Sequence, residues 1–163
     1  MSQNKIESLE KAFIRILHWG IFIDIFLPVV IFFLAIYLRD NFLSVQSLKN
    51  IELLFYVLII ISLGEILVIF IFRKRFWETF TQKKLQANSP LTMEQNLFRF
   101  GMIIYALCLS FTLYGLIYYL LGGTWERFAL FVAITFLSFQ LFKPRGGEIE
   151  KLIRDLKMEG QSF

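Results

Sequence analysis

Residues 53–72 decide the fold. They read LLFYVLIIISLGEILVIFIF and contain a single acidic side chain, Glu65, and no Lys, Arg or His. A helix of about 20 residues, rising about 1.5 Å per residue, crosses the roughly 30 Å hydrocarbon core of a bilayer. The apolar residues of this run cover every face of a helix, whereas a soluble amphipathic helix has a single apolar stripe. The run therefore predicts a transmembrane helix.

Three further apolar segments are long enough to span the membrane. They lie at about residues 19–38, 101–121 and 124–142. The chain of 163 residues is 57% hydrophobic and only 18% charged, which excludes a disordered chain and disfavours a soluble globule. A single cysteine, Cys108, excludes an intrachain disulfide. We therefore expect an all-α, polytopic membrane protein built as a four-transmembrane-helix bundle.

Three segments outside the spans have sequence patterns that predict their structure. Residues 5–17 repeat apolar positions at spacings of three and four, which predicts an amphipathic N-terminal helix lying along the membrane surface. Residues 148–158 predict a similar amphipathic helix at the C-terminus. Residues 73–96 are interpreted as a basic cytoplasmic loop with helical character, broken at residues 88–90, where Thr92 and Gln95 offer a capping box for the start of the third helix. Residues 1–163 thus form one integral membrane domain.

The basic residues indicate the orientation. Of the 17 Lys and Arg residues, 14 lie before the first span, between spans two and three, or after span four. The other two connections hold only Arg39, Lys49 and Arg127. Short loops rich in Lys and Arg stay in the cytoplasm, so both termini are predicted to be cytoplasmic. The absence of a targeting segment and of an N-x-[ST] acceptor favours a multi-pass protein of a prokaryotic inner membrane.

Few residues offer enzyme chemistry. The only histidine, His18, cannot supply both axial ligands of a haem or the several histidines of a common zinc site. No glycine-rich phosphate loop occurs, and topology explains the basic surplus without a nucleic-acid partner. We therefore expect no catalytic residues, no metal, no cofactor and no enzymatic activity.

Two acids inside spans are the main candidate site. Asp24 lies about 7.5 Å along the helix from Trp19, and Glu65 lies about 10.5 Å from Phe72, so both fall at nearly one depth. A charged acid at a helix centre costs about 2.5–3.5 kcal/mol on insertion scales, so both should face protein or water. Pro28 has no N–H for the Asp24 carbonyl and predicts a helix break there. Other polar side chains expected at this depth are Ser62, Tyr105, Thr135 and Ser138.

This polar layer has two interpretations. It is a proton or cation site, because an ionisable acid beside a broken helix is how transporters bind coupling ions. Alternatively, it is a buried hydrogen-bonded cluster that fixes helix packing or docks a partner. The favoured function is a non-enzymatic subunit or scaffold of a membrane complex; the alternative is a small oligomeric proton- or cation-coupled transporter or channel. The expected partners are the lipid bilayer and further copies or other membrane subunits.

Overall fold

The computed structural model describes residues 3–42, 50–83, 90–143, 147 and 154 of the chain. The described residues contain helices and no strand: α1 (Gln3–Ile21), η1 (Phe22–Phe26), α2 (Leu27–Phe42), α3 (Ile51–Lys83), α4 (Pro90–Leu120) and α5 (Trp125–Phe142). Four stretches are long and apolar enough to cross a membrane, namely Lys11–Asn41, Ile51–Glu78, Gln95–Leu120 and Trp125–Phe142. The chain is an all-α, four-span membrane bundle.

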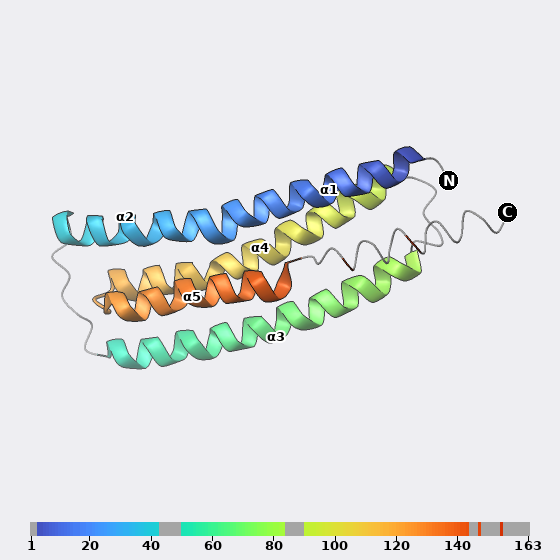
Figure 1. Ribbon diagram of the computed structural model, residues 1–163. Coiled ribbons are helices and arrows are strands. Elements are labelled where there is room, and N and C mark those ends of the chain that lie inside the picture. The colour runs from blue at the N-terminus through green and yellow to red at the C-terminus, as the bar shows by residue number, and fades with distance from the viewer. Residues whose placement is uncertain (1–2, 43–49, 84–89, 144–146, 148–153, 155–163) are drawn as a thin grey trace.

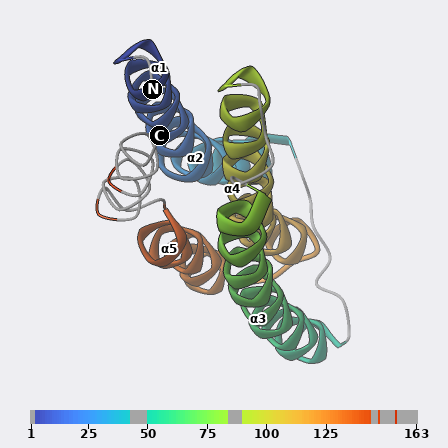
Figure 2. The same cartoon turned by 90° about the vertical axis from the view of Figure 1, so that its right-hand side faces the viewer.

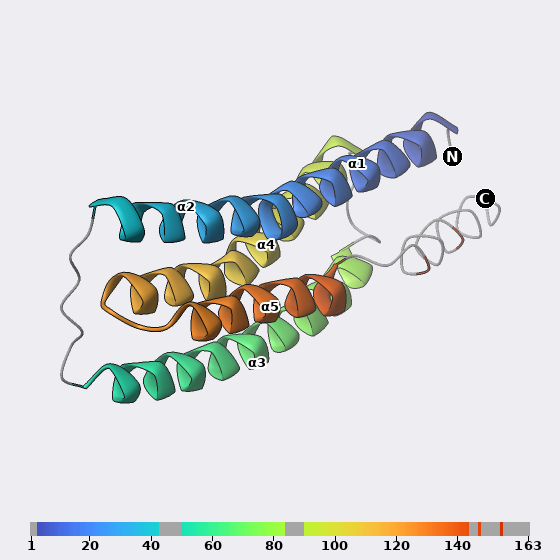
Figure 3. The ribbon, with the colours of Figure 1, turned by 60° about the vertical axis from the view of Figure 1, so that its left-hand side comes forward.

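Helix α4 is the centre of the bundle and packs against every other element. Figures 1 and 3 place the α4–α5 pair between the rod formed by α1, η1 and α2 on one side and α3 on the other. The view along the bundle in Figure 2 likewise separates α3 from α1 and α2. Helix α3 therefore joins the bundle through α4 and, to a smaller extent, α5.

The tightest packing joins α4 to α5. At Gly115 a Cβ would lie 2.7 Å from Phe128 Cδ2 and 2.7 Å from Phe131 Cβ, so only a hydrogen fits between these helices. The turn between them closes at Gly122, whose φ of 102° favours glycine. Gly123 donates its N–H to Tyr118 O at 3.0 Å. The short turn holds the last two spans as an antiparallel hairpin.

The first span does not begin as a separate surface helix. Helix is continuous from Gln3 through Phe42, and α1, η1 and α2 form one rod in Figure 1. Among the described side chains of α1, Ile16 is fully buried, and its Cγ2 lies 2.6 Å from where a Cβ of Gly101 would stand. The predicted N-terminal helix is thus present and continues directly into the first span, while its position along the membrane surface stays a prediction.

The segment interpreted as a loop at residues 73–96 is largely helical. Helix α3 runs to Lys83 and α4 begins at Pro90, where a residue without an N–H is readily accommodated. Stacking of Phe76 on Phe100, with ring centroids 3.5 Å apart, pairs the two helices outside the apolar runs predicted at residues 53–72 and 101–121. Nearly all of the predicted C-terminal helix at 148–158 lies outside the described residues.

Arginines close both ends of the bundle. At the end that holds the α4–α5 turn, Arg39 donates to Tyr119 O at 3.1 Å and to Gly123 O, and its guanidinium lies 4.4 Å from the Tyr119 ring centroid. At the opposite end, Arg73 donates to Leu141 O at 2.8 Å, near the C-terminus of α5. Cations near the last carbonyls of a helix also oppose its negative dipole end.

Candidate functional site

Asp24 lies in the interior of the bundle without a partner. Its side chain is fully buried, and neither carboxylate oxygen has a hydrogen-bond partner. Helices α4 and α5 pack against the short element η1 that carries it, and η1 continues into α1 and α2 at its two ends. Burying a carboxyl without a hydrogen bond or a counter-charge is costly, so this residue marks an unusual site.

The backbone at Asp24 forms a π-helical turn. The Leu27 N–H donates to Phe22 O, five residues back, where an α-helix would use the carbonyl four residues back. The predicted break at Pro28 is therefore corrected: Pro28 lies inside α2, and the rod continues through it. A wider turn before proline lets the helix tolerate the missing N–H without ending.

Tyr105 is brought next to this turn by Gly20. A Cβ at Gly20 would lie 2.4 Å from Tyr105 Cζ and 2.7 Å from its hydroxyl, so the tyrosine ring fills the space that a side chain would take. Tyr105 is fully buried, its hydroxyl has no hydrogen-bond partner, and it interacts electrostatically with Asp24, one helical turn beyond Gly20. The Phe139 ring of α5 packs on Tyr105 with centroids 5.8 Å apart.

Glu65 has a different environment from Asp24. Its Oε2 accepts a hydrogen bond from Ser110 Oγ at 2.7 Å, and its Oε1 accepts one from Tyr114 O–H at 2.9 Å. Both donors come from α4, four residues apart and hence on one face of that helix. Glu65 thus holds α3 to α4, and the two acids predicted to share a layer are not hydrogen-bonded to each other.

The remaining predicted residues of the layer make packing contacts. Ser62 donates to Leu58 O of its own helix at 2.8 Å. Thr135 donates to Phe131 O at 3.2 Å and lies 2.8 Å from the hydroxyl of Thr112 on α4. Ser138 is buried on α5. These polar side chains are therefore distributed over several helix contacts and do not surround one ligand.

Sequence inspection missed the residues of α4 that link the two acids to the bundle. Ser110 and Tyr114 bind Glu65, while Cys108 is fully buried and interacts electrostatically with both Asp24 and Glu65. The spacing of Tyr105, Cys108 and Thr112 by three and four residues was available as a sign that these polar side chains share one helix face. Their common burial follows from the central position of α4.

The fold and the site define a four-span integral membrane bundle with one unpaired buried carboxyl and one hydrogen-bonded carboxyl. Comparison with protein-family models, with curated proteins and with solved structures finds no match to this chain. The described residues contain no group of three or more His, Cys, Asp or Glu side chains placed to hold a metal ion. The arrangement of the helices and of the two acids is what bears on function.

Proposed function

We propose that this chain is a non-enzymatic integral membrane subunit or scaffold that acts by packing against further membrane chains. The observation that carries the proposal is the small share of residues in the first two spans that is buried by the rest of the chain. Within the most apolar stretch of each span, 17% of the residues are buried in the first span and 17% in the second. The corresponding shares are 44% in the third span and 39% in the fourth. The first two spans leave most of their surface for lipid or for partner helices.

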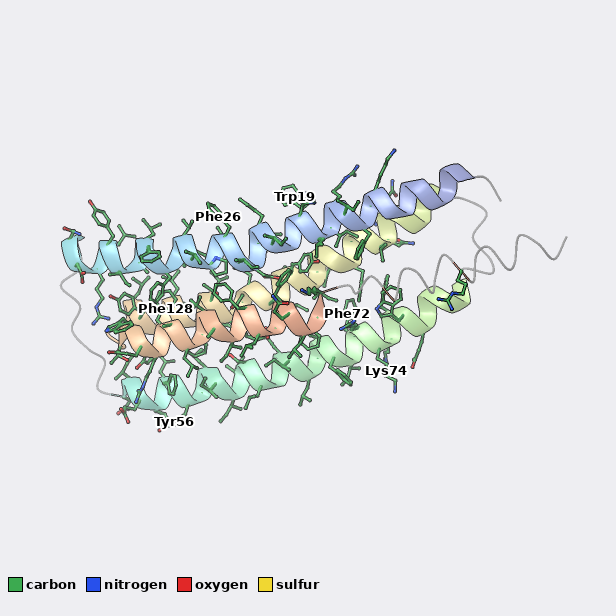
Figure 4. All side chains as sticks on the ribbon, in the orientation of Figure 1. Trp19, Phe26, Tyr56, Phe72, Lys74 and Phe128 are labelled. Atoms are coloured by element: carbon green, nitrogen blue, oxygen red, sulfur yellow. The ribbon has the colours of Figure 1, made fainter. Side chains whose placement is uncertain are left out.

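Helix α3 offers one of these faces. Its outer side exposes Ile60 by 67%, Leu63 by 58% and Leu67 by 64%, with Gly64 among them. A Cβ at Gly64 would meet nothing within 4 Å, so this glycine is not required by contacts inside the described chain. Figure 4 shows Tyr56 pointing away from the bundle on the same helix. Small residues let two membrane helices approach closely, which supports a partner helix at this face.

The polar residues support the same proposal. Glu65 binds two hydroxyls of α4, Ser62 binds its own helix and Thr135 binds Thr112. Each of these groups has a packing role, and none needs a substrate to explain its position. Hydrogen bonds between membrane helices contribute about 0.6 kcal/mol each on average and fix which faces meet.

A proton- or cation-coupled transporter or channel is the second candidate, supported by Asp24. An unpaired acid in the middle of a span is a functional signal, because its insertion cost is not offset by any contact that the described residues supply. This candidate no longer needs Glu65 as a second ligand. It requires a closed oligomer with a path to Asp24, whereas the subunit proposal requires a partner chain of different sequence.

We also propose a bacterial inner-membrane location with both termini in the cytoplasm. The four antiparallel spans bring the start of α1 and the end of α5 toward the same end of the bundle (Figure 1). Arg39 and Arg127, two of the three basic residues predicted outside, have structural contacts: Arg39 caps α4, and Arg127 pairs with Glu52 at 3.0 Å. Packing explains why these arginines depart from the positive-inside bias.

Mass determination after purification in mild detergent tests the subunit proposal. We expect a stoichiometric complex with a different membrane chain, and we expect Gly64→Leu to dissociate it because leucine fills the space at the α3 face. Intramolecular packing should survive, since no described atom lies near Gly64. A closed homo-oligomer would favour the transporter, and a monomer in every mild detergent tested would contradict both candidates.

A further inference from the structure

Two elements in contact, η1 and α4, carry three buried polar atoms without hydrogen-bond partners. They are the two carboxylate oxygens of Asp24 and the hydroxyl of Tyr105, and both residues are fully buried. Buried polar groups in proteins are hydrogen-bonded in more than about 90% of cases, and exceptions commonly mark a bound water or ion. Because the three unpaired atoms come from two elements that pack against each other, one bound water or ion between the elements would give all three a partner.

The π turn adds backbone oxygens to this place. In an α-helix the carbonyl of Ile23 would accept the Leu27 N–H, but that N–H donates to Phe22 O. The carbonyl of Asp24 would accept the N–H of residue 28, which is Pro28 and has none. Two carbonyl oxygens therefore lose their usual donors in the turn that carries the unpaired carboxyl. An oxygen-rich site of this kind is suited to a hard cation.

No cationic side chain of the described residues neutralises Asp24. From α4 the titratable groups that interact with it are Tyr105 and Cys108. On α1, His18 is exposed and its Nδ1 lies 2.8 Å from Ile14 O. On α2, Arg39 lies fifteen residues away, about 22 Å along the helix, at the far end of the rod.

On α5 the cation nearest to this region is Lys143. Its ammonium lies 5.9 Å from the centroid of the Phe139 ring, the ring that also packs on Tyr105. The other charged groups of α5, Glu126 and Arg127, lie at its opposite end. A compensating charge for Asp24 must therefore come from outside the described protein atoms.

We propose that Asp24, Tyr105 and the carbonyls of the π turn form a closed site for one monovalent positive charge, either a proton held with water or a sodium ion. Both occupants share one chemistry, which is to neutralise the carboxylate while satisfying the Tyr105 hydroxyl. Gly20 is part of the site, because its missing side chain admits the tyrosine ring. Glu65 is not, because both its oxygens have hydroxyl partners. The site is independent of whether the chain is a subunit or a transporter.

Thermal unfolding of the full chain in nanodiscs separates the two occupants. One series varies NaCl against choline chloride at fixed pH and ionic strength, and another varies pH without sodium. An occupant that binds only the folded state raises the unfolding midpoint with its concentration, so a proton site loses stability as pH rises. Once the site is populated, each tenfold change should move the midpoint by about 3–5 °C.

The variants assign the response. Asp24→Asn should abolish the dependence on sodium or pH, and Tyr105→Phe should weaken apparent affinity about two- to tenfold through loss of one hydrogen-bonding ligand. Glu65→Gln should retain the wild-type dependence. A sodium response lost in Asp24→Asn identifies the metal ion, and a pH response alone identifies the proton. No response in the wild type, or one that persists in Asp24→Asn, overturns the proposal.

If Asp24→Asn does not fold, infrared spectroscopy of the wild type provides the second test. A bound proton gives the carbonyl band of a neutral carboxyl. This band should persist in Glu65→Gln, because it belongs to Asp24. Bound sodium gives a carboxylate band that shifts when sodium is exchanged for choline. Absence of both signals would overturn the site.

Discussion

Replacing Gly115 by leucine is expected to disrupt the bundle more than any other substitution considered for this chain. A Cβ at Gly115 would already stand 2.7 Å from Phe128 Cδ2 and 2.7 Å from Phe131 Cβ. The Phe131 Cβ is fixed to the α5 backbone, so a rotamer change cannot relieve the contact and the two helices must separate. Overpacking a core costs about 1–3 kcal/mol for added methylenes, and an entire leucine side chain should exceed that range.

Denaturant unfolding followed by near-ultraviolet circular dichroism measures this loss. We expect Gly115→Leu to lack a cooperative tertiary transition, with Gly115→Ala intermediate. Gly64→Leu, measured like the others on the chain separated from any partner subunit, is the matched control, because it makes the same change at a spanning helix position with no described atom of another helix within 4 Å of the new Cβ. Equal stability of the two leucine variants would show that α4 and α5 are not packed at Gly115.

Replacing Arg39 by methionine should give the second-largest loss. Its guanidinium donates to the carbonyls of Tyr119 and Gly123 and lies 4.4 Å from the Tyr119 ring centroid. Tyr119 O lies in the last turn of α4 and also accepts the Gly122 N–H at 3.2 Å, whereas Gly123 O lies in the turn beyond the helix. Methionine keeps much of the apolar stem but leaves the two acceptors without this donor, which should cost about 1–3 kcal/mol.

The control for Arg39 is the exposed ion pair at the same end of the bundle. Glu52 pairs with Arg127 at 3.0 Å, but its side chain is 71% exposed. Exposed pairs contribute about 0–1 kcal/mol, so Glu52→Gln should barely change the free energy of unfolding. A loss for Arg39→Met as small as that for Glu52→Gln would mean that the arginine does not cap α4.

The sequence predicted the spans well because hydropathy depends on composition alone. The run at residues 53–72 lies inside α3, and the last predicted span matches Trp125–Phe142 closely. The helix ends that lie outside the apolar runs were harder to predict. Residues near Phe76 are basic and polar enough to resemble a loop, yet stacking on Phe100 keeps them helical.

The site was predicted less completely, since helix rotation cannot be inferred from one sequence. The sequence singles out Asp24 and Glu65 as acids inside spans, but their similar predicted depth does not bring them into hydrogen-bond contact. Glu65 instead meets Ser110 and Tyr114, two residues that look ordinary in an apolar run. Pro28 signalled a disturbed backbone, while the choice of a π turn over a break depends on packing around η1.

The most direct test of the four-span architecture and its proposed orientation is cysteine accessibility in intact cells. Cys108 is fully buried, and its replacement by alanine gives a background without a competing thiol. Single cysteines at Asn41 and Thr124, both exposed at the end of the bundle that holds the α4–α5 turn, should react with a membrane-impermeant maleimide. Cysteines at Ser2, Asn88 and Ser162 should react only after permeabilisation. Labelling of Ser2 and Ser162 from opposite sides would contradict the four-span bundle.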